Sequence, residues 1–457
     1  MSNIGICHFR VGLMDGVSLE INKWKTVLEE MGHKVYLLSG ETSSLDATII
    51  PELHLANPEI RKIYYNAFHS ISDFPSEEKF TQEICKIADH IEEKISSFIK
   101  KYSIDILDIE NIWSLPLNVP AAIALFRVIK STGIKAISHH HDFFWERSHF
   151  DHPTCKAIKE ILVTYFPPKN KLITHTVINT LARDELRKRR GINSVVIPNI
   201  FDFEGPEWKI DDYNYDFKEA LGLRPKDIII LQATRVISRK GIELAIDLVK
   251  ELTKPDNLLL LKERGFYDKR EIDEKSKVVL VLPNLIEDME YLKLLKEKIK
   301  KKNINALFIG DIVDIIRKME NNRKIYSLWD TYLFADLVTY PSLYEGWGNQ
   351  FLEAIKAKLP IVVFEYEVYK RDIKPNGFRV ISLGDKLKGK EVQGLYKIDS
   401  SVIKRVVKEA IRVLTDLPYR KKTVEYNFNL GRRLYSLPAL RKYLEPLFSK
   451  QYGRKLE

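Results

Sequence analysis

Residues 337–364 read LVTYPSLYEGWGNQFLEAIKAKLPIVVF, the pattern of a strand, a loop, a helix and a second strand. The apolar runs 337–340 and 361–364 predict the two strands, with a helix from about 350 to 358 between them. Strands joined through a helix in this way are parallel, and ligands of open parallel sheets bind at the carboxyl ends of the strands. The loop 341–349 is therefore the first place to look for chemistry.

This loop combines glycines with acidic and amide side chains. Gly346 and Gly348 keep Glu345 outside a regular helix, and Asn349 is predicted to cap the helix that follows. The N–H groups and the dipole of a helix start favour phosphate. A carboxylate beside a phosphate needs another partner, and hydroxyl groups fit this need. Glu353 would bind two ribose hydroxyls, while Glu345 would bind a hydroxyl of a transferred sugar and favour positive charge on its ring.

The same alternation of short apolar strands and helical patterns runs through the rest of the chain. An opening strand at 4–9 is followed by a helix that ends at Gly32 and by a strand at 34–38. Repeated strand–helix units predict an α/β fold with parallel sheets covered by helices on both faces. The further strands are expected at 104–109, 135–138, 171–177, 194–197, 227–233, 257–261, 277–282 and 306–309.

The length of 457 residues fits two large domains, and an irregular polar and aromatic stretch after Pro198 indicates where they divide. We expect domains at 1–200 and 201–422. A helical C-terminal tail at 423–457 is expected to cross back over the first domain, with breaks at Pro438 and Pro446.

Charge and cysteine content limit the classes of function. The net charge of +10 is compatible with a nucleic acid, an anionic membrane surface or a small polyanionic ligand, although acidic residues interrupt most of the basic runs. Three scattered cysteines without metal-ligand spacing indicate a reducing cytoplasm. No uninterrupted apolar run reaches the roughly 18 residues of a transmembrane helix, and peripheral membrane association is not indicated.

A second loop, 232–241, reads QATRVISRKG and lies between the strand expected at 227–233 and an amphipathic helix. Arg235 offers a fork of donors and Lys240 a compact charge. Together they would hold a diphosphate whose negative charge grows as a glycosidic bond breaks. Taken alone, the two residues are equally compatible with a pair of ordinary surface cations.

A third segment, 138–147, reads SHHHDFFWER at the end of a predicted strand. Because side chains alternate along a strand, His139 and His141 share one face, with Asp142 nearby. A metal site is one interpretation, although its remaining ligands are not visible in the sequence. A structural histidine cluster is the alternative.

These segments together resemble the retaining glycosyltransferases of the GT4 family, the glycosyl transferases group 1. The signature of that family is two glutamates separated by seven residues, and Glu345 and Glu353 match it in a Pro-Ser-x-Tyr-Glu-Gly-x-Gly context. Arg235 and Lys240 match the basic residues that the family uses on the donor diphosphate. The segment 15–17, Asp-Gly-Val, looks like its glycine-containing first loop.

The resemblance implies an α/β fold of GT-B architecture, with two Rossmann-like domains whose parallel sheets face a central cleft. The domain 1–200 would bind the acceptor, and the domain 201–422 would bind the nucleotide sugar. The expected catalytic residues are His141 and Glu345; the expected donor-binding residues are Gly16, Arg235, Lys240, Gly346, Gly348, Asn349, Gln350, Phe351 and Glu353; and the expected acceptor-binding residues are Asn111, His140, Asp142 and Arg147.

The implied activity is transfer of a hexose, with retention, from a GDP-mannose or UDP-glucose type of donor to a hydroxyl of a small polar or anionic acceptor. Within the family, segments 139–147 and 344–351 are similar to synthases of mannosylated compatible solutes. No Asp-x-Asp motif is well placed, since Asp311 and Asp314 have the wrong spacing. No metal ion or other cofactor is therefore expected, and the nucleotide sugar is a substrate.

Three alternatives stay open at this stage. A nucleotide-sugar epimerase and a phosphorylase can share the two-domain architecture, because a fold does not by itself determine the reaction. A non-enzymatic basic protein that binds nucleic acid is the third, and the net charge is its main support. The favoured partners are a nucleotide sugar and a small hydroxylated acceptor in the cytoplasm, with no nucleic acid.

Overall fold

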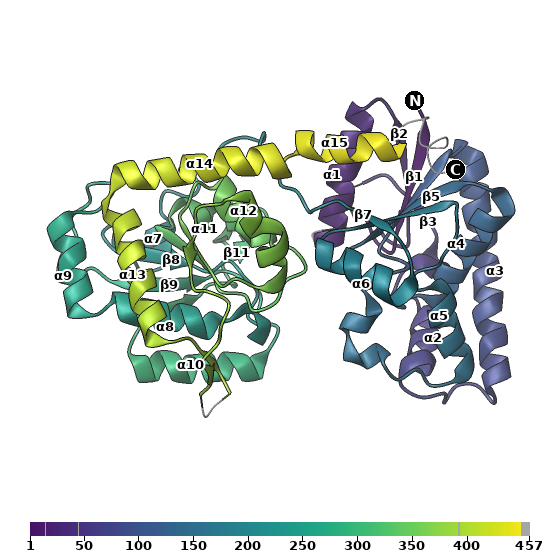
Figure 1. Ribbon diagram of the computed structural model, residues 1–457, viewed down its shortest axis with the longest axis horizontal. Helices are drawn as coiled ribbons and strands as arrows, with labels where there is room; N and C mark the ends of the chain where they lie inside the picture. Colours follow the sequence, from purple (N-terminus) through teal and green to yellow (C-terminus); the bar gives the residue numbers. More distant parts are fainter. Residues whose placement is uncertain (14, 44, 392–393, 449–457) are drawn as a thin grey trace. The chain divides into compact units, whose positions relative to one another are not determined.

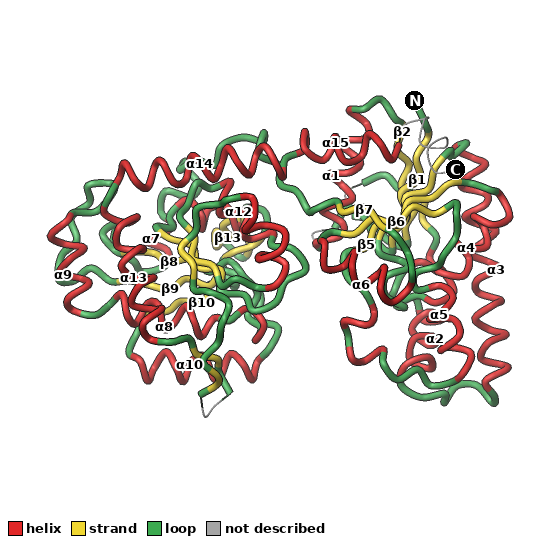
Figure 2. Tube along the Cα trace, in the orientation of Figure 1, coloured by secondary structure: helices red, strands yellow, loops and turns green. Residues whose placement is uncertain are grey.

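The computed structural model of the protein describes residues 1–13, 15–43, 45–391 and 394–448. Within these residues no helix is both long enough and apolar enough to cross a membrane. Figures 1 and 2 show that the chain forms two compact units, each with a central sheet surrounded by helices.

The first unit comprises Met1–Ile200 together with the last helix, α15 (Leu437–Phe448), and the second unit comprises Phe201–Ser436. The predicted tail 423–457 is thereby divided, because α14 (Leu417–Tyr435) belongs to the second unit. The end of that tail, from residue 449, lies outside the described residues.

The first unit is built on a seven-stranded parallel sheet with the order β3-β2-β1-β4-β5-β6-β7. The central strands are buried on both faces, as in other parallel sheets covered by helices, but β4 and β5 also carry buried polar side chains, among them Glu110 and His139. The strands are β1 (Asn3–His8), β2 (Lys34–Ser39), β3 (Thr48–Ile49), β4 (Ile106–Glu110), β5 (Lys135–His140), β6 (Ile173–Val177) and β7 (Ser194–Val196). The helices before α15 are α1 (Gly16–Glu30), α2 (Pro58–Phe68), α3 (Glu77–Tyr102), α4 (Val119–Thr132), α5 (Lys156–Tyr165) and α6 (Thr180–Arg190).

The helix α15 packs against α1, as Figure 1 shows. Leu440 and Leu444 are fully buried in the same hydrophobic cluster as Ile21 and Trp24 of α1. The break predicted at Pro438 is confirmed, because α14 ends at Tyr435 and α15 begins at Leu437. The break predicted at Pro446 is wrong, because α15 continues through it. Burial of the leucines on both sides of the proline outweighs the hydrogen bond that proline cannot donate.

The second unit has a six-stranded parallel sheet with the order β10-β9-β8-β14-β15-β16. The strand–helix–strand unit predicted at 337–364 is confirmed as β14, α12 and β15. The sheet strands are β8 (Ile228–Leu231), β9 (Val278–Leu282), β10 (Asn305–Phe308), β14 (Leu337–Tyr340), β15 (Ile361–Val363) and β16 (Ile381–Ser382). The smaller sheets contain β11 (Val313–Asp314), β12 (Lys318–Glu320), β13 (Arg323–Ser327), β17 (Gly389–Lys390) and β18 (Tyr396–Lys397). The helices before α14 are α7 (Phe217–Ala220), α8 (Ile242–Leu252), α9 (Pro255–Arg264), α10 (Met289–Lys302), α11 (Leu328–Leu333), α12 (Asn349–Lys356) and α13 (Ser400–Thr415).

One strand prediction is wrong, because residues 257–261 lie inside the helix α9. The run Asn-Leu-Leu-Leu-Leu contains no β-branched or aromatic residue, and leucine is a good helix former. Pro255 occupies the first turn, where its fixed φ suits a helix. Helix propensity and the N-terminal proline therefore decide the state of an apolar run that is too short to show a period.

Candidate functional site

Two of the predicted loops meet in the second unit. The strands β8 and β14 are parallel neighbours, so the loops that follow their carboxyl ends lie side by side. Lys240 ends a short 3-10 helix, Ser238–Lys240, and its ammonium forms an ion pair with Oε1 of Glu345. The ammonium also lies 5.9 Å from the ring centre of Tyr340. The structure thus joins one predicted donor-binding residue to one predicted catalytic residue.

A second cation, Arg239, completes this cluster. Its Nη1 lies 2.9 Å from Oε2 of Glu345 and donates to the carbonyl oxygen of Tyr344 at 3.1 Å. Arg239 is not among the residues predicted from the sequence, although its place next to Lys240 is a signal. Whether the side chains of a 3-10 turn reach a carboxylate distant in the sequence depends on where the fold places the turn.

The electrostatics of this cluster favour an anion. Burial opposes ionisation of Glu345, but the Lys240 and Arg239 cations outweigh it and lower the pKa of the carboxyl below its ordinary value. Burial also lowers the pKa of Lys240, with Glu345 acting in the opposite direction. Two cations and one carboxylate leave a formal charge of +1 beside the start of α12, where the helix dipole adds to the attraction.

Two glycines of these loops, Gly241 and Gly348, allow other groups to approach the backbone closely. Gly241 adopts φ +59°, and an added Cβ there would overlap the carbonyl oxygen of Pro341. An added Cβ at Gly348 would lie 2.5 Å from the hydroxyl of Tyr366. The predicted cap is wrong by one position, because Gly348 is the cap residue and Asn349 begins α12. Gly348 adopts φ +156°, a conformation that residues with a side chain rarely adopt, which explains why glycine occupies the cap position.

The remaining predicted donor residues lie around the start of α12. Glu353 accepts a hydrogen bond from the hydroxyl of Tyr332 at 2.7 Å and is nearly buried. Gly346 precedes the helix and Gln350 is half-buried in its first turn. Phe351 is 0% exposed and its ring packs edge-on against other aromatic rings, so its role in this structure is in the core.

Arg235 pairs with a different carboxylate, that of Glu287, although its charge also lowers the pKa of Lys240. Its Nη1 lies 2.5 Å from Oε1 of Glu287, and its side chain is about half exposed. A backbone hydrogen bond joins the two loops that carry Arg235 and Glu287, since the N–H of Val236 donates to the carbonyl oxygen of Leu285 at 2.9 Å. A diphosphate that binds Arg235 must therefore compete with Glu287.

In the first unit, four predicted residues form one hydrogen-bonded chain at the ends of β4 and β5. The amide oxygen of Asn111 accepts from the backbone N–H of His141 at 3.0 Å, and its Nδ2 donates to Asp142 at 3.1 Å. Asp142 forms an ion pair with Arg147. Asn111 adopts a left-handed conformation with φ +58°, which asparagine tolerates better than most residues.

Behind this chain lies Glu110, which the sequence reasoning did not assign. Its Oε2 lies 3.2 Å from Nε2 of His141, and its side chain is 0% exposed. Burial raises the pKa of Glu110 well above its ordinary value and lowers the pKa of His141. Glu110 stood beside Asn111 at a strand end, but only the pairing of β4 with β5 brings it to the imidazole.

His140 was predicted to contact an acceptor, and the structure places it elsewhere. The side chain is 0% exposed; its Nδ1 lies 2.6 Å from the hydroxyl of Ser114, and its Nε2 lies 3.0 Å from Nδ1 of His175. His175 in turn donates through Nε2 to the carbonyl oxygen of Pro168 at 3.0 Å. Side chains alternate along a strand, so His140 points to the face opposite His139 and is a buried structural residue.

Three side chains of this region could in principle share a metal ion. The ligand atoms of Glu110, His139 and His141 all lie within 4.8 Å of one another, as the one such group among the described residues. His139 also contacts the hydroxyl of Thr176 through Nδ1 at 2.7 Å. The histidines make hydrogen bonds within the protein, as a structural cluster does.

Gly16 begins α1, directly after its cap residue. The side chain of Asp15 accepts hydrogen bonds from the backbone N–H groups of Val17 and Ser18 and pairs with Arg10 at 3.0 Å. An added Cβ at Gly16 would meet no atom within 4 Å. Packing therefore does not require glycine at this position.

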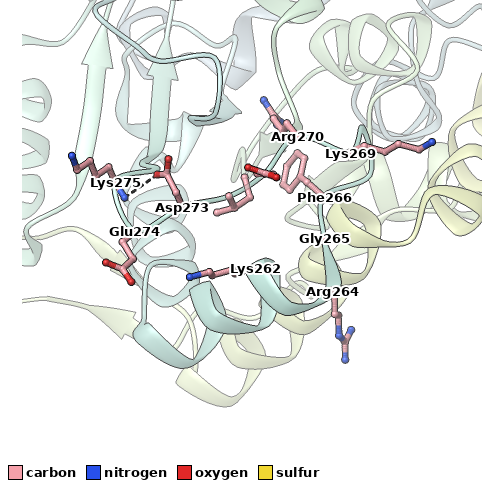
Figure 3. A pocket seen from close by; sticks show the side chains of 11 residues that line it. Lys262, Arg264, Gly265, Phe266, Lys269, Arg270, Asp273, Glu274 and Lys275 are labelled. Carbon is pink, nitrogen blue, oxygen red and sulfur yellow. Dashed lines mark hydrogen bonds between the residues drawn. The ribbon is translucent and has the colours of Figure 1, made fainter.

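An open hollow of about 850 Å³ lies at the end of α9, lined by none of the predicted site residues. Figure 3 shows its charged side chains, among them Lys262, Lys275 and Asp273, whose carboxylate accepts from the backbone N–H of Lys275 at 2.9 Å. Its lysines and arginines are accompanied by acidic side chains, and no predicted donor residue lines it. The hollow thus gives no support for a donor site there.

Comparisons with known proteins show which family this chain belongs to. A family model described as glycosyl transferases group 1 matches residues 215–382. The chain is 41% identical over 439 residues to a mannosylglucosylglycerate synthase of Petrotoga mobilis, covering 96% of this chain and 99% of the relative. It is 40% identical over 442 residues to the enzyme of the same name from Thermotoga maritima, covering 96% and 98%.

Among solved structures, a sucrose-phosphate synthase from Thermosynechococcus elongatus resembles this chain with a TM-score of 0.59 at 12% identity, covering 99% of this chain and 100% of that one. This likeness concerns the fold alone. With the two parallel-sheet units, it confirms the expected GT-B fold class.

Proposed function

This chain belongs to the group 1 glycosyl transferases, and on that premise we propose that it transfers a mannosyl group from GDP-mannose to a hydroxyl of glucosylglycerate. The observation that carries the proposal is the identity of 40–41% to two mannosylglucosylglycerate synthases across nearly the whole chain. The name of their product contains one mannosyl group attached to a small anionic acceptor. That chemistry fits the polar acceptor that the sequence predicts.

The second unit would bind the donor. Lys240, Arg235 and the start of α12 would offset the charge of the diphosphate, which increases as the bond to the sugar breaks. Glu353 would bind the ribose hydroxyls. Glu345, which the neighbouring cations keep ionised, would bind the sugar and stabilise positive charge on its ring.

The first unit would bind the acceptor through Asn111, Asp142 and Arg147, and His141 would hold a sugar hydroxyl. We expect retention of the anomeric configuration, with the acceptor hydroxyl attacking from the face that the phosphate leaves. The acceptor oxygen forms the new bond to the sugar carbon, the bond to the phosphate oxygen breaks, and that oxygen takes the acceptor proton. The transition state would resemble an oxocarbenium ion, as in glycoside hydrolysis.

We also propose that transfer requires no divalent ion. The formal charge of +1 on the Arg239, Lys240 and Glu345 cluster, together with Arg235 and the helix start, supports this. Activity that disappears in excess EDTA and returns only with a divalent ion would contradict it.

The test is product analysis with purified protein. We expect GDP-mannose and glucosylglycerate to yield mannosylglucosylglycerate and GDP, with an α-configured new linkage by NMR, and UDP-glucose to be a poor donor. The Glu345→Gln variant should lose at least about 100-fold in rate. Conversion of the donor without acceptor would indicate an epimerase, and dependence on free phosphate would indicate a phosphorylase.

A further inference from the structure

Glu110 is the last residue of β4, and its side chain is not exposed to water. The side chain is 0% exposed, and Oε1 has no hydrogen-bond partner among the described residues. The backbone oxygen of Glu110 accepts from Nδ1 of His8 on β1 at 2.6 Å, which holds the strand end in place. Because a buried carboxyl is unfavourable, its presence calls for an interaction that an apolar residue cannot make.

That interaction is with His141. Two contacts involve the imidazole: Nε2 lies 3.2 Å from Oε2 of Glu110, and the His139 ring packs edge-on with its centre at 4.7 Å. The backbone N–H of His141 donates to Asn111 at 3.0 Å, which fixes the main chain. Since Nε2 is engaged toward the interior, Nδ1 is the ring nitrogen left for a ligand, as far as the described contacts show. His141 itself is only 11% exposed at its side chain, so it has little freedom to turn.

We propose that Glu110 is a positioning residue that holds the His141 imidazole in one orientation and one tautomer, with Nδ1 presented to a sugar hydroxyl. The inference deepens the proposed function and rests on it for the role of His141. A buried carboxylate that orients a histidine is a known device in enzymes, because the bond made by one ring nitrogen determines whether the other donates or accepts.

Asp108 provides the matched control. It lies two residues earlier on β4, so it points to the same face, and it is also 0% exposed. Burial raises the pKa of both carboxyls. No contact of Asp108 with His141 is among those found in the described residues. If activity falls when Glu110 is replaced but not when Asp108 is replaced, removal of a buried carboxyl cannot by itself explain the loss.

The test is a double-mutant cycle on the full chain. Glu110→Ala should lower kcat by about tenfold or more with less than about threefold change in donor KM, while Glu110→Gln, which still hydrogen-bonds Nε2, should recover most of the rate. Combined with His141→Ala, the Glu110→Ala change should cause no further loss. Asp108→Asn should stay within about threefold of wild type. Glu110→Leu replaces Glu110→Ala if the latter does not fold.

A second measurement is independent of turnover. In ¹⁵N-histidine NMR spectra, the imidazole signal that His141→Ala removes should show a single tautomer in wild type and averaging of both in Glu110→Ala. Three outcomes would overturn the inference. The tautomer could be unchanged in Glu110→Ala, or the losses in rate could multiply in the double variant. The third is that the wild type holds a stoichiometric metal ion that Glu110→Ala releases. A wild-type protein without transfer activity would sink the proposed function instead, and the NMR result would still decide the role of Glu110.

Discussion

The buried ion pair between Lys240 and Glu345 allows stability and catalysis to be separated. The two side chains are 3% and 9% exposed, so removal of one charge leaves the other without its partner in a poorly solvated site. Breaking such a pair typically costs about 3–5 kcal/mol. In Lys240→Met, Arg239 still contacts Glu345, so we expect the loss of stability to lie near the lower end of this range. Glu345→Gln leaves Lys240 and Arg239 close together without a carboxylate between them, so we expect its loss of stability to lie near the upper end.

The double variant Lys240→Met/Glu345→Gln removes both charges. We expect it to regain most of the lost stability, within about 1–2 kcal/mol of wild type, because an uncharged pair of similar volume avoids the desolvation of both ions. For a unit of this size, 1 kcal/mol corresponds to roughly 2–4 °C in Tm. The single variants should therefore unfold roughly 6–20 °C below wild type, and the double variant within a few degrees of it.

The assay combines thermal unfolding with the rate of sugar transfer for all three variants. Transfer should fall at least about 100-fold in each of them, including the double variant, because both charges act on the reacting groups in the proposed mechanism. A double variant as unstable as the sum of the singles would refute the buried-pair reasoning. A double variant that transfers sugar at the wild-type rate would refute the catalytic role.

Three further predictions follow from single sites. Burial lowers the pKa of His175 to about 4, so its neutral form contributes stability above pH 6.5 that is lost as the pH falls toward 4. Urea unfolding at pH 7 and pH 4 should show that His175→Gln avoids roughly 3 kcal/mol of this loss. Equal losses in the variant and the wild type would argue against this reasoning. Gly348→Ala should lower the free energy of unfolding by about 1–3 kcal/mol, because the added Cβ meets the hydroxyl of Tyr366. Gly16→Ala has open space around it and should change the free energy of unfolding by less than about 1 kcal/mol. Equal Tm values for the two variants would contradict the close approach of Tyr366 to Gly348. Leu440→Ala should destabilise the first unit by about 2–5 kcal/mol and make α15 easier to cleave by protease, and unchanged cleavage would mean that its packing on α1 contributes little.

The local pattern of the sequence was enough for the architecture. The alternation of apolar runs and helical periods predicted parallel sheets, and residues 337–364 form the predicted strand, helix and strand. Both loops of the second-unit cluster were identified, because glycines and charged residues directly after a buried strand carry their signal within about ten residues. Where the local signal was ambiguous, as at 257–261, the prediction failed.

The tertiary structure alone decided which of the charged residues touch one another. Arg239 reaches Glu345 because β8 and β14 pair, and Glu110 reaches His141 because β4 and β5 pair. His140 reaches His175 because β5 and β6 pair. Strand order and register depend on the packing of segments far apart in the sequence, so no local pattern contains these contacts.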